Sequence, residues 1–145
     1  MVKRVRTREA LADALDPKLN VAVFETRQVS DDWDAVREEL FQLFESSRSA
    51  ASEGVAIVYI VSSEALLGRT GPGNAMVATG ALSAARTLAA ELEKAEVPVN
   101  VIGTRDDTPI EVLATWVATL ATSGPDGPTG ELIQLGGTQI GKALP

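Results

Sequence analysis

The few side chains in this sequence that could do chemistry are concentrated in one block, residues 55–95. Residues 55–63 read VAIVYIVSS, residues 64–73 EALLGRTGPG and residues 74–95 NAMVATGALSAARTLAAELEKA. Ser63 ends a continuous apolar run, where its hydroxyl can donate one hydrogen bond to a substrate oxygen or serve only the turn into the next helix. Tyr59 lies in the middle of that run, so we expect its phenol in the core and not in a site.

The glycines of residues 68–73 precede an expected helix, and such a loop can hold a phosphate with its backbone N–H groups. Their spacing is GxxGxG and not the GxGxxG of dinucleotide-binding turns. Asn74 can cap the helix without a ligand. The pattern favours an ordinary turn, and Arg69 is the remaining argument for an anion there.

Other reactive groups are scarce. The chain has no His and no Cys, which excludes the commonest neutral-pH base, thiol nucleophiles, disulfides and thiolate metal sites. The carboxylate pairs Asp106–Asp107 and Glu38–Glu39 are neighbours in sequence, but we expect each on a solvated loop or helix face. Without His or a placed water, they give little support for acid–base chemistry or for Mg²⁺.

Composition indicates one compact domain, with 45% hydrophobic residues in a chain of 145. The net charge of −7 argues against partners such as nucleic acid or an anionic membrane, and the basic residues Lys3, Arg4 and Arg6 are expected to be a solvated lead-in. The longest apolar run, residues 55–61, is too short to span a membrane, and no secretory signal opens the chain. We expect a soluble, cytoplasmic protein.

The elements that position these residues can be read from the sequence, which alternates between apolar runs and segments of helical periodicity. We expect helices at residues 8–15 with Thr7 as N-cap, from a Ser30 cap to about 49, at 74–95 and at 109–122, and strands at 20–24, 55–61, 98–102 and 131–135. Alternation of this kind predicts an α/β domain with a parallel sheet of about four strands, flanking helices and right-handed crossovers.

The central block resembles the catalytic segment of the short-chain dehydrogenase/reductase family, in which a serine ends a strand and a tyrosine and a lysine follow on the next helix. Residues 30–36 (SDDWDAV), 97–102 (VPVNVI) and 129–137 (TGELIQLGG) resemble further segments of that family. The similarity extends from about residue 19 to residue 137, and it implies a partial Rossmann-like sheet.

When the sequence is aligned with the family, Ser63 matches the family's serine. Met76 stands where the family has its tyrosine, Gly80 where it has its lysine and Leu40 where it has a helical asparagine. The family's tyrosine transfers the proton, and its lysine lowers the tyrosine pKa and holds the cofactor ribose. The glycine-rich TGxxxGxG turn does not occur in this sequence. We therefore expect residues 1–145 to form a single truncated domain without the dinucleotide-binding half, with no catalytic residues, no bound NAD(P) or other cofactor, and no metal.

The resemblance also implies assembly, because the family's helices matching residues 32–49 and 74–95 often pack against their twofold mates. The residues expected at such an interface are Leu40, Phe44, Ala78, Ala81, Ala85 and Ala89. The alternative is that the alanines pack against the chain's own sheet. The strand at residues 20–24 lacks its usual neighbour, so residues 2–6, a second copy or another protein should cover its edge.

The leading hypothesis is a non-catalytic pseudoenzyme that acts as a structural or regulatory subunit, homodimeric or paired with an active full-length short-chain dehydrogenase. A second hypothesis is a small-ligand or acyl-binding module that uses a cleft near Ser63, Arg69 and Met76. A third is an oxidoreductase subunit whose cofactor half comes from another chain.

Overall fold

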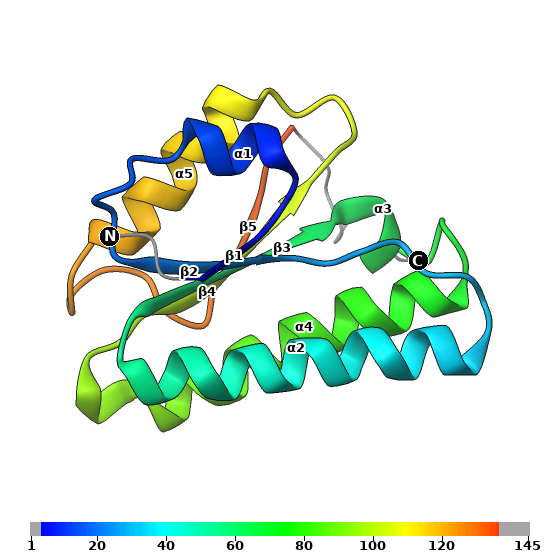
Figure 1. The fold of residues 1–145 in the computed structure, drawn as a ribbon, viewed down its shortest axis with the longest axis horizontal. Coiled ribbons are helices and arrows are strands. Elements are labelled where there is room, and N and C mark those ends of the chain that lie inside the picture. The colour runs from blue at the N-terminus through cyan, green and yellow to red at the C-terminus, as the bar shows by residue number, and fades with distance from the viewer. Residues whose placement is uncertain (1–3, 137–145) are drawn as a thin grey trace.

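A computed structural model of the protein describes residues 4–136, and its centre is a five-stranded, wholly parallel sheet (Figure 1). The strands follow chain order across the sheet: β1 (Arg4–Arg6), β2 (Val21–Glu25), β3 (Ala56–Ser62), β4 (Val99–Thr104) and β5 (Leu132–Gln134). The α/β class and parallel sheet are confirmed. The fifth strand is β1, which the sequence analysis did not assign.

Helices cover both faces of this sheet, with α2 and α4 on one side and α1 and α5 on the other (Figure 1). Their bounds are α1 (Glu9–Ala14), α2 (Trp33–Glu53), α3 (Ser63–Leu66), α4 (Pro72–Glu91) and α5 (Ile110–Thr122), and a short 3₁₀ turn, η1 (Glu93–Ala95), follows α4. Gly54 ends α2 in the left-handed conformation, with φ of 69°. None of the helices between residues 4 and 136 is long and apolar enough to cross a membrane.

The continuous apolar sequence of β3 follows from its burial on both faces. Tyr59 and its alternate neighbours Ile57 and Val61 belong to the core under α2 and α4. Val58 and Ile60 point the other way and pack with Leu11 of α1 and Leu113 of α5, among others. All the side chains of β3 from residue 56 to residue 61 are buried, and the predicted core position of Tyr59 is confirmed.

The crossovers do not all have the same hand. Every connection steps one strand in the same direction, because the parallel strands follow chain order. The hand of a crossover then depends only on which face its helix covers, and α1 and α5 cover the face opposite α2 and α4. The two pairs of crossovers therefore have opposite hands, and the expectation that all are right-handed is wrong.

The helix caps differ from those expected. Arg8, and not Thr7, is the N-cap of α1, and Asp32, and not Ser30, is the N-cap of α2. Neither cap residue makes a side-chain capping hydrogen bond. Thr7 donates its hydroxyl to the carbonyl of Arg8 instead. The chain therefore enters these helices without the N-cap side-chain hydrogen bonds that the sequence predicts.

The N-terminal segment covers the edge of β2, as one of the three expected candidates. Residues 4–6 pair in parallel with residues 22–24. Arg6 also donates from its guanidinium to both carboxylate oxygens of Glu39 on α2, at 2.8 and 2.5 Å, and to the carbonyl of Glu25. Glu39 is buried, with 5% of its side chain exposed, so neither Arg6 nor Glu39 is the solvated surface group that the sequence suggested.

Removing one member of this buried pair should be costly. We expect Arg6→Leu to lower the free energy of unfolding by about 3 kcal/mol or more, because it leaves the Glu39 carboxylate buried without its counter-ion. Arg37→Leu is the matched control, since Arg37 pairs with Asp34 on the exposed surface of α2; it should cost about 0–1 kcal/mol. Urea unfolding measures both.

The double variant Arg6→Leu/Glu39→Leu should recover much of that loss, because an apolar pair needs no compensating charge. Equal losses for Arg6→Leu and Arg37→Leu would show that the buried pair contributes no more than a surface one.

Candidate functional site

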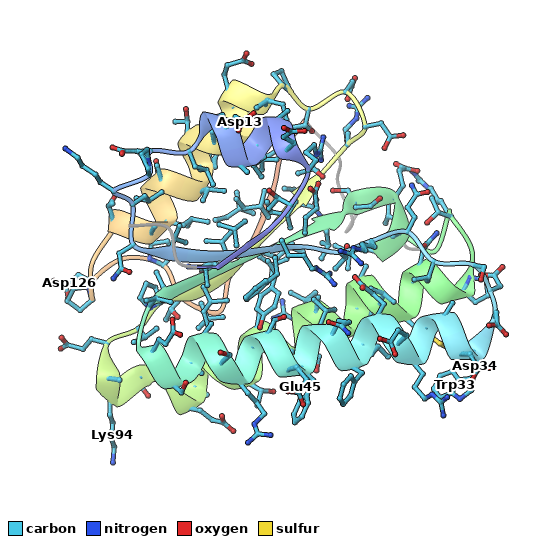
Figure 2. All side chains as sticks on the ribbon, viewed as in Figure 1. Asp13, Trp33, Asp34, Glu45, Lys94 and Asp126 are labelled. Carbon is cyan, nitrogen blue, oxygen red and sulfur yellow. The ribbon has the colours of Figure 1, made fainter. Side chains whose placement is uncertain are left out.

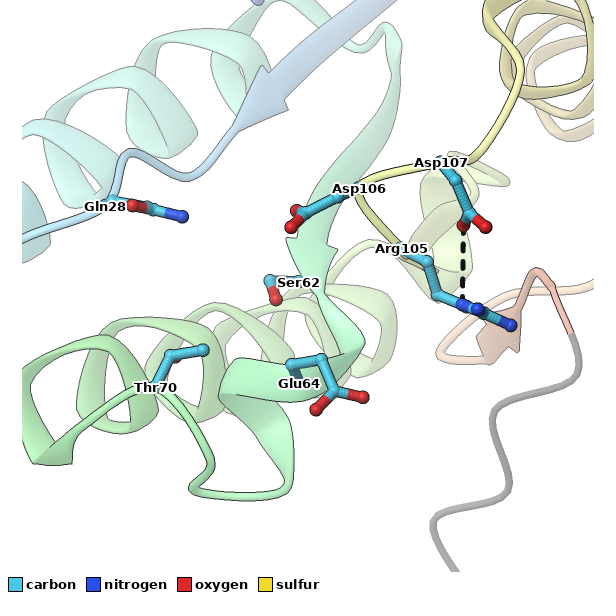
Figure 3. A pocket seen from close by; sticks show the side chains of 7 residues that line it. All are labelled: Gln28, Ser62, Glu64, Thr70, Arg105, Asp106 and Asp107. Atoms are coloured by element: carbon cyan, nitrogen blue, oxygen red, sulfur yellow. Dashed lines mark ion pairs between the residues drawn. The ribbon is translucent and has the colours of Figure 1, made fainter.

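The best candidate site is a crevice at the carboxyl ends of β2, β3 and β4, where parallel sheets commonly bind ligands. It consists of two adjoining hollows of about 290 and 240 Å³. Gln28, Ser62, Arg105 and Asp106 line both of them. In Figure 3, the side chains of Gln28 and Asp106 approach each other from opposite walls, with Ser62 between them. We call these two hollows the carboxyl-edge crevice.

Ser63, the serine singled out from the sequence, does not face this crevice. Its side chain is fully buried, and its hydroxyl donates to Oε1 of Gln134 on β5 at 2.5 Å. Gly103 makes room for the pair, because a Cβ there would lie 2.8 Å from Ser63 Oγ. Ser63, the first residue of α3, thus ties the start of this helix to β5.

Sequence reasoning missed Ser62, the serine that does line the crevice. Its Oγ accepts a hydrogen bond from the N–H of Ala65 at 3.2 Å and so caps the short helix α3. The serine three residues before Ala65, at the start of a turn of helix, is the signal that could have identified this role.

Met76 and Gly80 lie apart from the crevice-lining residues. Met76 is 52% exposed near the start of α4. Gly80 faces α2, and a Cβ added to it would come within 2.9 Å of Leu40 Cδ2. Leu40 and Gly80 are the residues that the resemblance aligned with the asparagine and the lysine, so an apolar contact between helices stands at these positions. Neither Met76 nor Gly80 can transfer a proton.

The glycine loop at the start of α4 is held by hydrogen bonds from other parts of the chain. Asp31 Oδ1 accepts the backbone N–H of Gly73 at 3.0 Å. Gly71, with φ of 98°, is the N-cap of α4, whereas Asn74 bridges loops by accepting from the N–H of Val29 and donating to the carbonyl of Thr70. Arg69 is exposed and pairs with Glu64 at 3.2 Å. The interpretation as an ordinary turn therefore agrees with these contacts, although Asn74 is not the cap.

A second contact between distant parts of the chain lies at the turn from β1 to α1. Glu25, at the end of β2, accepts the backbone N–H of Arg8 at 3.0 Å and the Nε of its guanidinium at 3.1 Å, and it also pairs with Nη2. The hydrogen bond with Glu25 raises the pKa of Arg8 above its ordinary value, although burial opposes this shift. Both carboxylate oxygens of Glu25 are engaged by Arg8.

The carboxylates of the crevice are the other charged groups that a ligand would meet. Asp107 pairs with Arg105 Nε at 3.4 Å (Figure 3), and Arg105 also donates to the carbonyl of Gly136. Asp106 and Glu64 add two further carboxylates to the lining. Within residues 4–136, no group of three or more His, Cys, Asp or Glu side chains could hold a metal ion.

Tyr59 and Ser47 form a buried polar pair that lines an apolar groove between α2 and α4. Their hydroxyl groups share a short hydrogen bond, and Ser47 also donates to the carbonyl of Leu43. Burial raises the pKa of the Tyr59 phenol, and the hydrogen bond with Ser47 opposes the shift. This phenol is a structural group and does not line the carboxyl-edge crevice.

Known structures show which fold this is. A short-chain dehydrogenase from Mycobacterium smegmatis superposes with a TM-score of 0.68 and 16% identity over 83% of this chain and 59% of its own. The NADH-dependent enoyl-[acyl-carrier-protein] reductase of Aquifex aeolicus VF5 gives 0.65 and 15%, over 79% and 60%. The chain has the fold of the short-chain dehydrogenases.

A halohydrin dehalogenase has the same short-chain dehydrogenase fold, with a TM-score of 0.68 and 20% identity over 88% of this chain and 70% of its own. The chain thus spans about 60% of the length of the first two proteins named above. No protein-family model matches the sequence, and no curated protein is significantly similar to it.

The carboxyl-edge crevice does not fit the dinucleotide that the fold family implies. Phosphate groups need free N–H donors and positive charge. Here the backbone N–H and the guanidinium of Arg8 are already bonded to Glu25. Arg105, which lines both hollows, is paired with Asp107 and donates to the carbonyl of Gly136. Asp106 adds an acidic side chain to both hollows. No catalytic step through such a cofactor follows from the residues present.

The buried serine provides a test of its structural role. We expect Ser63→Ala to lower the free energy of unfolding by about 1–3 kcal/mol, because it removes the partner of the Gln134 amide, whose Nε2 is buried without a partner among the described residues. Ser52→Ala, which removes an exposed serine of α2, should change stability by less than about 0.5 kcal/mol.

Adding Gln134→Met to Ser63→Ala should restore stability, because it removes the stranded amide as well. Urea unfolding of the three variants measures these differences. A loss for Ser63→Ala no larger than for Ser52→Ala would contradict the role assigned to this hydrogen bond.

Proposed function

We propose that this protein is a non-catalytic relative of the short-chain dehydrogenases that acts as a structural or regulatory subunit, as a homodimer or paired with an active short-chain dehydrogenase. The observation that carries the proposal is the outward face of α2 and α4. On it, large apolar side chains are exposed where a monomer would gain from burying them: Trp33, Phe41, Phe44 and Met76, each more than half exposed.

Between the two helices this face is hollowed into an apolar groove of about 500 Å³. Leu40 and Phe44 form one wall, and Gly80, Ala84 and Leu88 form the other. We call it the outer groove. Figure 2 shows that the labelled Trp33 and Glu45 of α2 point away from the sheet, so this side of the helix is free of the chain's own layers.

Of the alanines expected at an interface, Ala81 lines the outer groove, whereas Ala78, Ala85 and Ala89 do not. Ala78, Ala81, Ala85 and Ala89 are buried in the core under the sheet, with at most 7% exposure. The alternative noted from the sequence, packing against the chain's own sheet, is the arrangement observed. Of the expected interface, Leu40 is half-buried beside the outer groove and Phe44 is 56% exposed.

The outward side of α4 nonetheless consists of small residues, although they are not the alanines expected from the sequence. Gly80, Ser83, Ala84 and Thr87 line the outer groove, and residues of this size let a partner helix approach closely. Exposed aromatic anchors beside a shallow apolar groove are typical of the centre of a protein interface. The same patch on two copies can be self-complementary about a twofold axis.

Two observations support the absence of catalysis. The positions of the family's tyrosine and lysine hold Met76 and Gly80, which offer no exchangeable proton. Leu40 fills the space beside Gly80, so a lysine at residue 80 would require α2 to shift or Leu40 to move.

A second candidate function is a small-ligand module at the carboxyl-edge crevice. The observation in its favour is that the side chains of Gln28 and Asp106 line both hollows and make no hydrogen bond within residues 4–136. Unpaired polar groups that converge on one crevice are the usual means of orienting a ligand. Ser62 would replace Ser63 in such a site.

The assembly role predicts that a charge in the outer groove separates the subunits. We expect Phe44→Glu to weaken self-association or pairing with a dehydrogenase by about a hundredfold, because it places a carboxylate where an aromatic anchor is buried. Val112→Glu is the matched control: Val112 is 42% exposed on α5, on the opposite side of the sheet, and its variant should associate like the wild type.

Sedimentation velocity at micromolar concentration and native mass spectrometry of the protein from its source cells distinguish the homodimer from the mixed complex. A protein that is monomeric by the first method and alone by the second would overturn the assembly role. Titration with NADH and NADPH, followed by fluorescence, should show no saturable change, and micromolar affinity would contradict the non-catalytic reading.

A further inference from the structure

At two places near the carboxyl ends of the strands, a carboxylate of the chain itself accepts a backbone N–H group. The first is the turn between β1 and α1, where Glu25 binds Arg8. The second is the glycine loop before α4, where Asp31 binds the N–H of Gly73. Both carboxylates come from the segment that leaves β2, so one stretch of chain supplies both internal anions.

The contact at Arg8 has the geometry by which proteins bind external anions. A guanidinium offers parallel N–H donors that match a carboxylate or phosphate, and here Nε and Nη2 both point at the carboxylate of Glu25. The backbone N–H of the same arginine adds a third donor at 3.0 Å. All three donors therefore converge on one carboxylate.

We call the three donors of Arg8 the Arg8 seat. This seat is part of the carboxyl-edge crevice and not a remote surface bridge. Arg8 and Glu25 line the 240 Å³ hollow together with Gln28, Ser62 and Asp106. The side chain of Glu25 is only 18% exposed, and that of Arg8 42%. An anion that entered this hollow would have to replace the Glu25 carboxylate to reach the donors, and it would meet the charge of Asp106 as well.

We propose that Glu25 is a built-in anion that occupies the Arg8 seat and thereby closes the carboxyl-edge crevice to phosphate-bearing ligands. All three donors of the Arg8 seat are present, but the group they bind is the chain's own Glu25 carboxylate. The inference does not depend on assembly through the outer groove, which lies on α2 and α4, and each can fail without the other.

The test is to remove the charge of Glu25 and measure binding of inorganic pyrophosphate by calorimetry at low ionic strength. The wild type should show no saturable binding at millimolar pyrophosphate. Glu25→Gln should bind at least about tenfold more tightly, because the Arg8 donors become available to the added anion. Glutamine keeps the size of the side chain and an acceptor for the N–H of Arg8; if this variant fails to fold, Glu25→Thr, which suits a strand, takes its place.

Two controls separate the effect of freeing the Arg8 donors from the effect of removing a negative charge. Asp106→Asn removes one charge from the same hollow but leaves Arg8 bonded to Glu25, so it should show no gain. Arg8→Gln added to Glu25→Gln should abolish the gain. The proposal is overturned if a folded Glu25 variant binds no better than the wild type, if the wild type already binds as tightly, or if Asp106→Asn gives the same gain.

Discussion

The buried ion pair between Arg6 and Glu39 is the constraint on which the arrangement of the N-terminal half depends. A carboxylate inside a helix face that packs on a sheet is costly unless its charge and lone pairs are matched. Here both oxygens accept from Arg6, and one also accepts the backbone N–H of Arg27 at 2.8 Å. Strand β1, the loop after β2 and helix α2 therefore meet at one side chain. Because Arg6 is fixed, the next turn of chain brings Arg8 to the end of β2, beside Glu25.

Carboxylates as internal ligands are a consistent feature of this molecule. Glu39, Glu25 and Asp31 each accept a backbone N–H from a loop or from the start of a helix, in a chain with a net charge of −7. Such bonds are charge-assisted and order the loops without help from a bound ligand. The cost is that these donors are no longer free. The carboxyl edge of the sheet is ordered by the chain itself, which supports the proposed scaffold role.

The sequence predicted those parts of the fold that periodicity governs. The apolar run of β3 and the helical spacing of α2, α4 and α5 were read correctly, because each reports burial directly. Strand β1 was missed, since three residues rich in arginine read as a solvated segment and only Glu39, 33 residues away, decides otherwise. Likewise, periodicity identified the alanine face of α4 but could not say whether its own sheet or another chain covers it. Ser62 and Ser63 are adjacent and chemically alike, and only the partner on β5 separates the buried one from the crevice.

Helix packing and the position that the resemblance aligns with the family's lysine meet at one contact. Leu40 of α2 reaches Gly80 of α4 so closely that even a Cβ at residue 80 would come within 2.9 Å of it. Close approach of the two helices leaves Phe44 and Gly80 on the rim and wall of the outer groove, and it buries the alanine face of α4 against the sheet. A lysine at residue 80 would require Leu40 to move or α2 to shift. In the proposed role as a non-catalytic subunit, Gly80 therefore has two roles: it keeps the outer face shallow and apolar, and it offers no exchangeable proton where the resemblance aligns the family's lysine.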